Sequence, residues 1–127
     1  MALRPTFNSG DVFTAVNANI LATSIVALVT QSGTAVTAAL TDVGKLINFT
    51  SGTAVAFTIP ANATVAFSVG DQLNIFQAGT ATVTITPAAT VTIRSSGTKL
   101  KTNDQFSVAT CIKIDTNEWI ALGNLKA

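Results

Sequence analysis

The sequence predicts a mainly β protein: an antiparallel β-sandwich or barrel-like domain, preceded by an extended N-terminal arm and one short helix. Three observations predict this fold class. Alternating apolar and polar residues recur from Thr34 onward, turn-forming residues separate these runs, and no alternation of strand and helix patterns follows. A chain of 127 residues has the size of one domain. We therefore assign residues 1–33 to the arm and helix, and residues 34–127 to the β domain.

The first residues are predicted to form an extended arm. Residues 1–12 contain Pro5 and Gly10 and show little periodicity, yet apolar side chains recur in and just after this stretch. An arm of this kind is expected to dock on another surface rather than to float free. The residues that we expect to form this assembly interface are Leu3, Pro5, Phe7, Val12 and Phe13.

One helix is predicted, over Ala15–Thr23. Thr14 suits the N-cap position, because its hydroxyl can accept from the first free backbone amides. Apolar residues then recur near helical spacing, at Val16, Ile20, Leu21, Ile25 and Leu28. The end of this stretch, Ile25–Thr30, is rich in β-branched residues and could equally be a strand.

The β domain is predicted from short runs with period-two alternation. In Thr80–Thr86, Thr occupies one face and Ala, Val and Ile the other, and Pro87 ends the run because proline cannot donate to a ladder. The longest one-sided set alternates through Phe106–Ile114. The other runs are Leu46–Thr50, Ala54–Ile59, Leu73–Ala78, Thr90–Ile93 and Trp119–Leu122. Turn-forming residues such as Ser51-Gly52 and Asn103-Asp104 separate these runs, which is typical of an antiparallel sandwich or barrel.

The composition is poor in charge. Charged residues make up 10% of the chain, against about 25% in an ordinary soluble domain, and the mean hydropathy is +0.51. Neutral polar groups cover the exterior, or much of the exterior is buried against other subunits, and both can hold together. The nearest basic cluster, Arg94, Lys99 and Lys101, is too small to neutralise many phosphates, so we expect no nucleic-acid partner.

Two N-terminal stretches bear on targeting. Residues 1–13 lack the apolar segment of a signal peptide, since Arg4 and Pro5 are followed by polar residues. The longest candidate membrane stretch, Ala15–Val29, contains two Asn residues and falls short of the roughly 20 apolar residues that a span requires. We therefore expect no membrane partner.

Catalytic chemistry is hard to assemble from this sequence. The chain has no His and no Tyr, so the ordinary general base near neutral pH is missing. Most of the six acidic residues sit beside turn residues, where carboxylates usually bind backbone amides. One Cys without His excludes a zinc site, and no oxygen-rich loop suits calcium. We expect no enzymatic activity, no metal and no cofactor.

Two residues with distinctive chemistry are assigned to the interior. Cys111 lies on the same side of its run as Ala109 and Lys113, and a lone Cys most often packs as a small apolar residue. Trp119, the only Trp, is expected to close the core rather than to bind a saccharide.

Two stretches carry a pattern found in known proteins. Residues Thr6–Ala15 with Asn17–Ile20 resemble the opening of many bacteriophage virion proteins, although Phe13 stands where Leu is commoner. The second pattern covers about Asp42–Leu125. Its motifs are, in order, Asp42–Leu46, Thr58–Pro60, Val69–Gly70, Ile75–Gly79, Val83–Ile85, Val91–Ser95, Thr110–Ile114 and Trp119–Gly123. This order resembles a β module found repeatedly in phage structural proteins.

The resemblance implies a non-enzymatic virion structural protein that assembles, often as a trimer, and it supplies no catalytic residues. We expect a capsid decoration (cement) protein on the head surface of a bacteriophage, where it stabilises the head lattice. Its partners would be further copies of the chain and the major capsid protein or other virion proteins. The alternative, which the resemblance permits equally, is a tail-fibre or baseplate component, such as an adhesin that binds the host surface. A cell-wall hydrolase would need two carboxylates across a cleft, which nothing in the sequence suggests.

Overall fold

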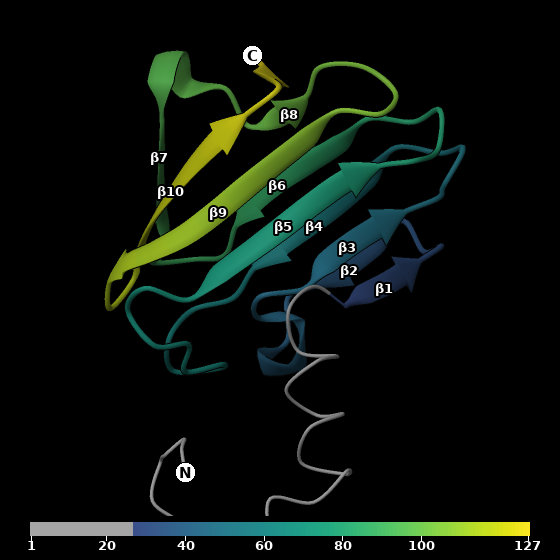
Figure 1. Cartoon of the computed structure of the whole chain (residues 1–127). Helices are drawn as coiled ribbons and strands as arrows, with labels where there is room; N and C mark the ends of the chain where they lie inside the picture. The colour runs from purple at the N-terminus through teal and green to yellow at the C-terminus, as the bar shows by residue number, and fades with distance from the viewer. Residues whose placement is uncertain (1–26) are drawn as a thin grey trace, which may run out of the picture.

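Two β-sheets packed face to face make up the part of the chain that the computed structural model describes, residues 27–127 (Figure 1). The six-stranded sheet contains, in spatial order, β1 (Leu28–Gln31), β3 (Leu46–Phe49), β5 (Gln72–Gln77), β9 (Val108–Asp115), β10 (Glu118–Gly123) and β7 (Thr92–Ser95). The five-stranded sheet contains β11 (Leu125–Lys126), β8 (Lys101–Thr102), β6 (Val83–Pro87), β4 (Val55–Ile59) and β2 (Ala35–Thr37). The predicted mainly β, sandwich-like fold is confirmed.

Short 3-10 turns, η1 (Leu40–Asp42) and η2 (Ser96–Thr98), are the helical elements of the described residues. The helix predicted over Ala15–Thr23 lies outside those residues, as does the arm. The stretch whose sequence allowed either helix or strand contributes β1, which pairs with β3. β1 therefore belongs to the sheet, although it lies in the range 1–33 that we assigned to the arm and helix.

The chain changes sheet after each strand from β1 to β8. β1, β3 and β5 are parallel neighbours in one sheet, and β2, β4 and β6 are parallel neighbours in the other. The first half of the domain is therefore wound as a coil of three turns, in the manner of a β-solenoid. β8 and β9 then add antiparallel neighbours to β6 and β5, and β10 follows β9 as a hairpin.

The predicted antiparallel arrangement is wrong for much of the domain, because five of the nine strand pairings are parallel. The physical reason lies in the connections. Residues 50–54 and 78–82 contain turn-forming residues of the kind found in hairpins, but they carry the chain across to the opposite sheet. Strands that are consecutive in sequence are therefore not neighbours until β9 and β10.

The core lies between the two sheets and is built from ladders of apolar side chains. Ile47 stands beside Ile75 in the six-stranded sheet, and Phe57 stands beside Ile85 in the five-stranded sheet. All four are buried. Phe49 contacts Phe57 edge to face across the core, with ring centroids 5.4 Å apart. Because parallel pairing aligns equivalent inward positions, each turn of the coil adds one apolar layer to the core.

The connection over residues 60–71 packs against the end of the sheet where the hairpin turn joins β9 to β10. Lys113 is buried, and its Nζ donates to Asn62 Oδ1 at 2.6 Å and to the Phe67 carbonyl at 2.7 Å. The Phe67 ring packs edge to face on Trp119, with centroids 5.3 Å apart. The predicted interior positions of Cys111 and Trp119 are confirmed, since both side chains are buried.

Candidate functional site

The outer face of the six-stranded sheet is the most unusual surface of the described residues. Strand alternation turns one set of side chains inward and leaves the other set on the outside. Apolar residues occupy much of this outside set. They are Leu28, Leu46, Phe76, Val108, Ile112, Ile114, Ile120 and Leu122. A sheet face that meets water normally carries mainly polar residues, so this face differs from the ordinary pattern.

Strand register places these apolar side chains in adjacent pairs around a polar centre, in which Asn74 stands between Leu46 and Thr110. Leu28 stands opposite Leu46, and Ile112 stands opposite Ile120. Isolated surface apolar residues are common on monomers, but contiguous ones mark interaction sites. Exposed fractions of 50% at Leu122 and 62% at Leu28 show that the described residues leave this surface uncovered.

Two phenylalanines form one corner of this face. Phe106, in the loop before β9, stacks on Phe76 with ring centroids 6.2 Å apart and remains 65% exposed. The backbone of Phe106 has φ +72°, a left-handed conformation that bulky side chains rarely adopt. Its amide donates to the Gln77 carbonyl at 2.6 Å, which holds it there. Strain of about 1–3 kcal/mol at such a residue is typical of functional positions.

The polar residues in the middle of this face bind one another. Asn74 Oδ1 accepts from Gln72 Nε2 at 2.8 Å and from Thr110 Oγ1 at 3.0 Å. Asn74 Nδ2 donates to the Lys45 carbonyl at 3.3 Å. Because these groups are already partnered, covering the face would leave few of them without a hydrogen bond, while Asn48 Oδ1 on β3 already has no partner among the described residues.

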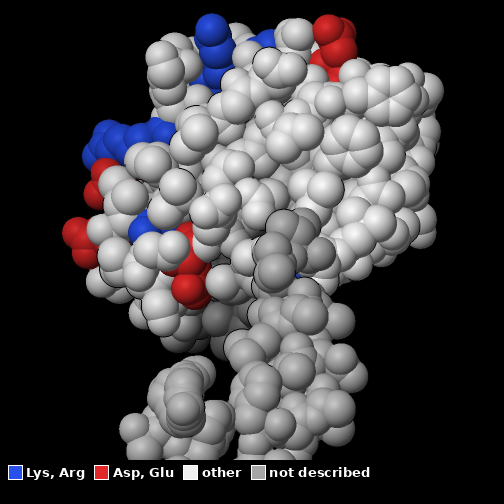
Figure 2. All heavy atoms as spheres, in the orientation of Figure 1, with Lys and Arg blue, Asp and Glu red and all other residues white. Residues whose placement is uncertain are grey.

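Charge is confined to the margin of this face. Among its outward strand residues, Arg94 and Glu118 carry charge, and they pair at the β7 edge with Nε and Oε2 2.5 Å apart. Figure 2, which views the face from the front, shows Lys, Arg, Asp and Glu toward its left-hand and upper margins and a broad region without them. Covering this region therefore requires no ion to lose its water.

The outer face of the five-stranded sheet is different. Its outward residues are Ala35, Thr37, Ala56, Thr58, Thr84, Thr86, Lys101 and Lys126. The predicted Thr face of β6 is confirmed here, since Thr84 and Thr86 lie outside while Val83 and Ile85 are buried. Small and hydroxyl-bearing side chains give a sheet face that is stable in water. The two outer faces of one sandwich thus have different chemistry.

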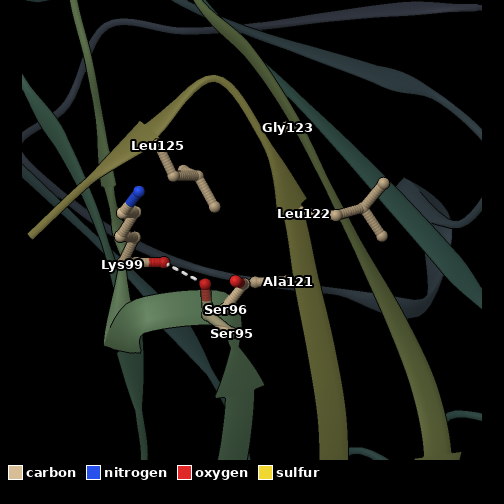
Figure 3. Close-up of a pocket in the computed structure, with 7 residues that line it drawn as sticks. All are labelled: Ser95, Ser96, Lys99, Ala121, Leu122, Gly123 and Leu125. Carbon is tan, nitrogen blue, oxygen red and sulfur yellow. Dashed lines mark hydrogen bonds between the residues drawn. The ribbon is translucent and has the colours of Figure 1, made fainter.

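A hollow of about 190 Å³ lies between the ends of β7 and β10, where Leu125 and Lys99 also line it (Figure 3). Ser95 is another of its lining residues, and Ser95 Oγ donates to the Lys99 carbonyl at 2.5 Å. Small-molecule sites usually measure about 300–1,000 Å³ and gather several polar groups. This hollow is smaller and has one charged side chain, so it makes a poor ligand site.

The acidic residues of the described part serve local structure. Asp42 Oδ2 accepts from the Ala39 amide at 2.9 Å, and Asp71 Oδ2 accepts from the Ser68 amide at 2.8 Å. Asp115 Oδ1 accepts from the Thr116 amide at 2.7 Å. Across residues 27–127, no group of three or more His, Cys, Asp or Glu side chains could hold a metal ion.

Cys111 is unsuited to nucleophilic chemistry. Burial raises the pKa of its thiol from 9.0 to about 12, because the interior penalises the charged form. The thiol is therefore protonated near neutral pH, whereas a reactive cysteine needs the thiolate. The interpretation of Cys111 as a small core residue agrees with this environment.

The residues that we predicted as an assembly interface, Leu3, Pro5, Phe7, Val12 and Phe13, all lie outside the described residues. The sequence interpretation did not single out the outer face of the six-stranded sheet. One signal was available: four of the five members of the one-sided set through Phe106–Ile114 are apolar, while the set between its members contains Ser107 and Lys113. The structure turns the more apolar set outward.

Comparison with known proteins gives no relative: no protein-family model, curated protein or solved structure matches the chain. From residue 27 onward, the structure has no helix with the length and hydropathy needed to cross a membrane.

Proposed function

We propose that this chain is a non-enzymatic structural subunit of a bacteriophage particle, and specifically a capsid decoration protein that stabilises the head lattice. The observation that carries the proposal is the broad outer face of the six-stranded sheet, whose charged residues lie only at the margin. A protein that works by association needs such a surface, whereas an enzyme needs convergent reactive groups. The order of sequence motifs, which resembles that of phage structural proteins, supports the choice of a virus particle.

The remaining chemistry of the domain supports a structural role. The carboxylates of Asp42, Asp71 and Asp115 bind backbone amides, and Glu118 pairs with Arg94. The one thiol is buried and protonated near neutral pH. Groups that are already engaged in holding turns together are poorly placed to act on a substrate.

The proposed mechanism is mass action. A protein that binds the assembled lattice but not its separated subunits stabilises the lattice by about 2.7 kcal/mol per site when its concentration is a hundredfold above the dissociation constant. The β domain would lie on the particle surface as a trimer. The N-terminal arm, with Leu3, Pro5, Phe7, Val12 and Phe13, would clamp the major capsid protein or a neighbouring copy.

Co-sedimentation with particles tests this proposal. Purified full-length chain is added to particles of the source phage that have been stripped of it, and a variant lacking residues 1–13 is compared. We expect the full chain to pellet with the particles and the truncated chain to stay in the supernatant with unchanged circular dichroism. A full chain that does not pellet with any particle form would overturn the proposed function. A truncated chain that pellets normally would remove the arm from the mechanism.

A further inference from the structure

We propose that the outer face of the six-stranded sheet is the surface through which copies of this chain associate with one another. The inference deepens the proposed function by naming the surface and its occupant. It rests on the proposed function in one respect: we take the self-associated form to be the form that is present on particles. The occupant that we infer is a second copy of the chain, and four properties of the face support this choice.

The first property is size. Six strands about 4.8 Å apart and about six residues long cover a projected area of about 500 Å². Side-chain relief and the Phe106 loop enlarge the area that a partner could cover. A standard stable interface takes about 800 Å² from each partner, so the face supplies most of one.

The second property is shape. Pairs such as Phe76 with Val108 and Ile112 with Ile120 form apolar ridges on adjacent strands, and the polar pair Asn74 and Thr110 lies between them. Sheet faces of this kind pack on one another about 10 Å apart with their strands nearly aligned. A second copy presents the same relief, so one surface can serve both partners.

The third property is charge. Recognition of a different protein commonly uses complementary charges. Between β1 and β9, the outward strand residues of this face are all neutral. A neutral face does not repel its own copy, and the net charge of +1 for the whole chain adds little repulsion. The face therefore favours self-association over selection of a charged partner.

The fourth property is the placement of the aromatic corner. Phe106 is held in a left-handed backbone conformation and left 65% exposed, with its ring stacked on Phe76. In an isolated chain this arrangement carries strain and exposes apolar surface. In an associated form the same ring becomes buried against the partner, and aromatic residues are among those that commonly anchor interfaces.

The matched substitutions are Val108→Lys on this face and Ala56→Lys on the other outer face. Val108 lies on β9 and is 47% exposed, and Ala56 is an exposed residue of β4. A lysine stem can lie along the surface with its ammonium in water, so both variants should fold. Both add one positive charge, and only Val108→Lys places it in the proposed interface.

Sedimentation equilibrium of the full-length proteins measures the effect. We expect a wild-type mass that is a multiple of 13.0 kDa: two copies if one face packs directly on its counterpart, and three if each chain turns this face toward a common threefold axis, as the resemblance implies. The Val108→Lys variant should dissociate at concentrations at least about a hundredfold higher, because like charges would face each other in a dry interface. Ala56→Lys should behave as wild type. A wild type that is monomeric at about 100 µM, or a Val108→Lys variant of unchanged mass, overturns the inference.

A photo-crosslinking amino acid at Leu122 identifies the occupant independently of folding effects. Crosslinks between two chains that join this face to its counterpart support the inference. Crosslinks within one chain to residues 1–26, or to a different protein, overturn it. The two proposals fail separately: a chain that self-associates but never pellets with particles contradicts the proposed function alone. A chain that pellets with particles, but whose mass in solution is the same with and without Val108→Lys, contradicts the inference alone.

Discussion

Replacing Gly79 by Ala should destabilise the domain severely, because this glycine lies against the backbone of the preceding turn of the coil. A Cβ at Gly79 would lie 2.2 Å from the Ser51 carbonyl oxygen and 2.6 Å from the Thr50 carbonyl carbon. Ordinary van der Waals contact begins at 3.4 Å, so the two backbones must separate by about 1.2 Å. That movement disturbs the hydrogen bonds from the Ala78 and Gly79 amides to the Phe49 carbonyl, each 2.9 Å long.

The magnitude follows from these contacts. Overpacking costs about 1–3 kcal/mol, and each weakened hydrogen bond adds about 0.5–1.5 kcal/mol. With two hydrogen bonds affected, we therefore expect Gly79→Ala to lower the free energy of unfolding by about 2–6 kcal/mol. Urea unfolding followed by Trp119 fluorescence measures this loss, at one protein concentration because association shifts apparent stability.

Gly52→Ala is the matched control, since Gly52 lies in the connection against which Gly79 packs. A Cβ there would meet only Thr80 Oγ1, at 3.7 Å. Its effect should stay within about 0.5 kcal/mol of wild type, or be slightly stabilising through the unfolded state. Equal stabilities for Gly79→Ala and Gly52→Ala would refute the close stacking of successive turns.

Two further predictions concern the core. Trp119→Ala should cost about 3–5 kcal/mol in the free energy of unfolding, because the ring is buried and packs on Phe67; a loss below about 0.5 kcal/mol in chemical denaturation would place the residue outside the core. For Cys111, the raised pKa of about 12 means that unfolded chains release the thiol proton first. The associated stability is complete below about pH 9 and falls toward pH 12, by at most about 1.4 kcal/mol per pH unit. Denaturation at about pH 8 and at about pH 10.5 measures the free energy of unfolding at each pH. Between the two pH values this free energy should decrease less for Cys111→Ala than for wild type. Equal decreases for the two proteins would contradict the buried thiol.

The sequence predicts the strands of this domain well and their pairing poorly. Alternation located β4, β6 and β9, because burial on one side imposes period two on the residue pattern regardless of the neighbouring strand. Pairing direction depends on where each connection leads. The turn residues Ser51-Gly52 suit a hairpin equally well as a crossing to the opposite sheet.

The candidate site was harder to predict for a related reason. Alternation divides β9 into two sets but does not say which set faces the core. The inward set contains Cys111 and Lys113, whose long side chain is buried only because Asn62 and Phe67 accept its hydrogen bonds. Those partners lie about fifty positions earlier in the chain, beyond the reach of a local pattern. The outward apolar set became recognisable as a surface only when β5 and β10 were placed beside it.

Location on the particle tests the central claim most directly. Antibody raised against this chain is applied to intact particles of the phage proposed to carry it, and a gold-labelled second antibody is viewed by electron microscopy. The account predicts label distributed over the head. Label confined to the tail would contradict the decoration role and favour the appendage alternative. Particles without label anywhere on their surface would contradict the virion function itself.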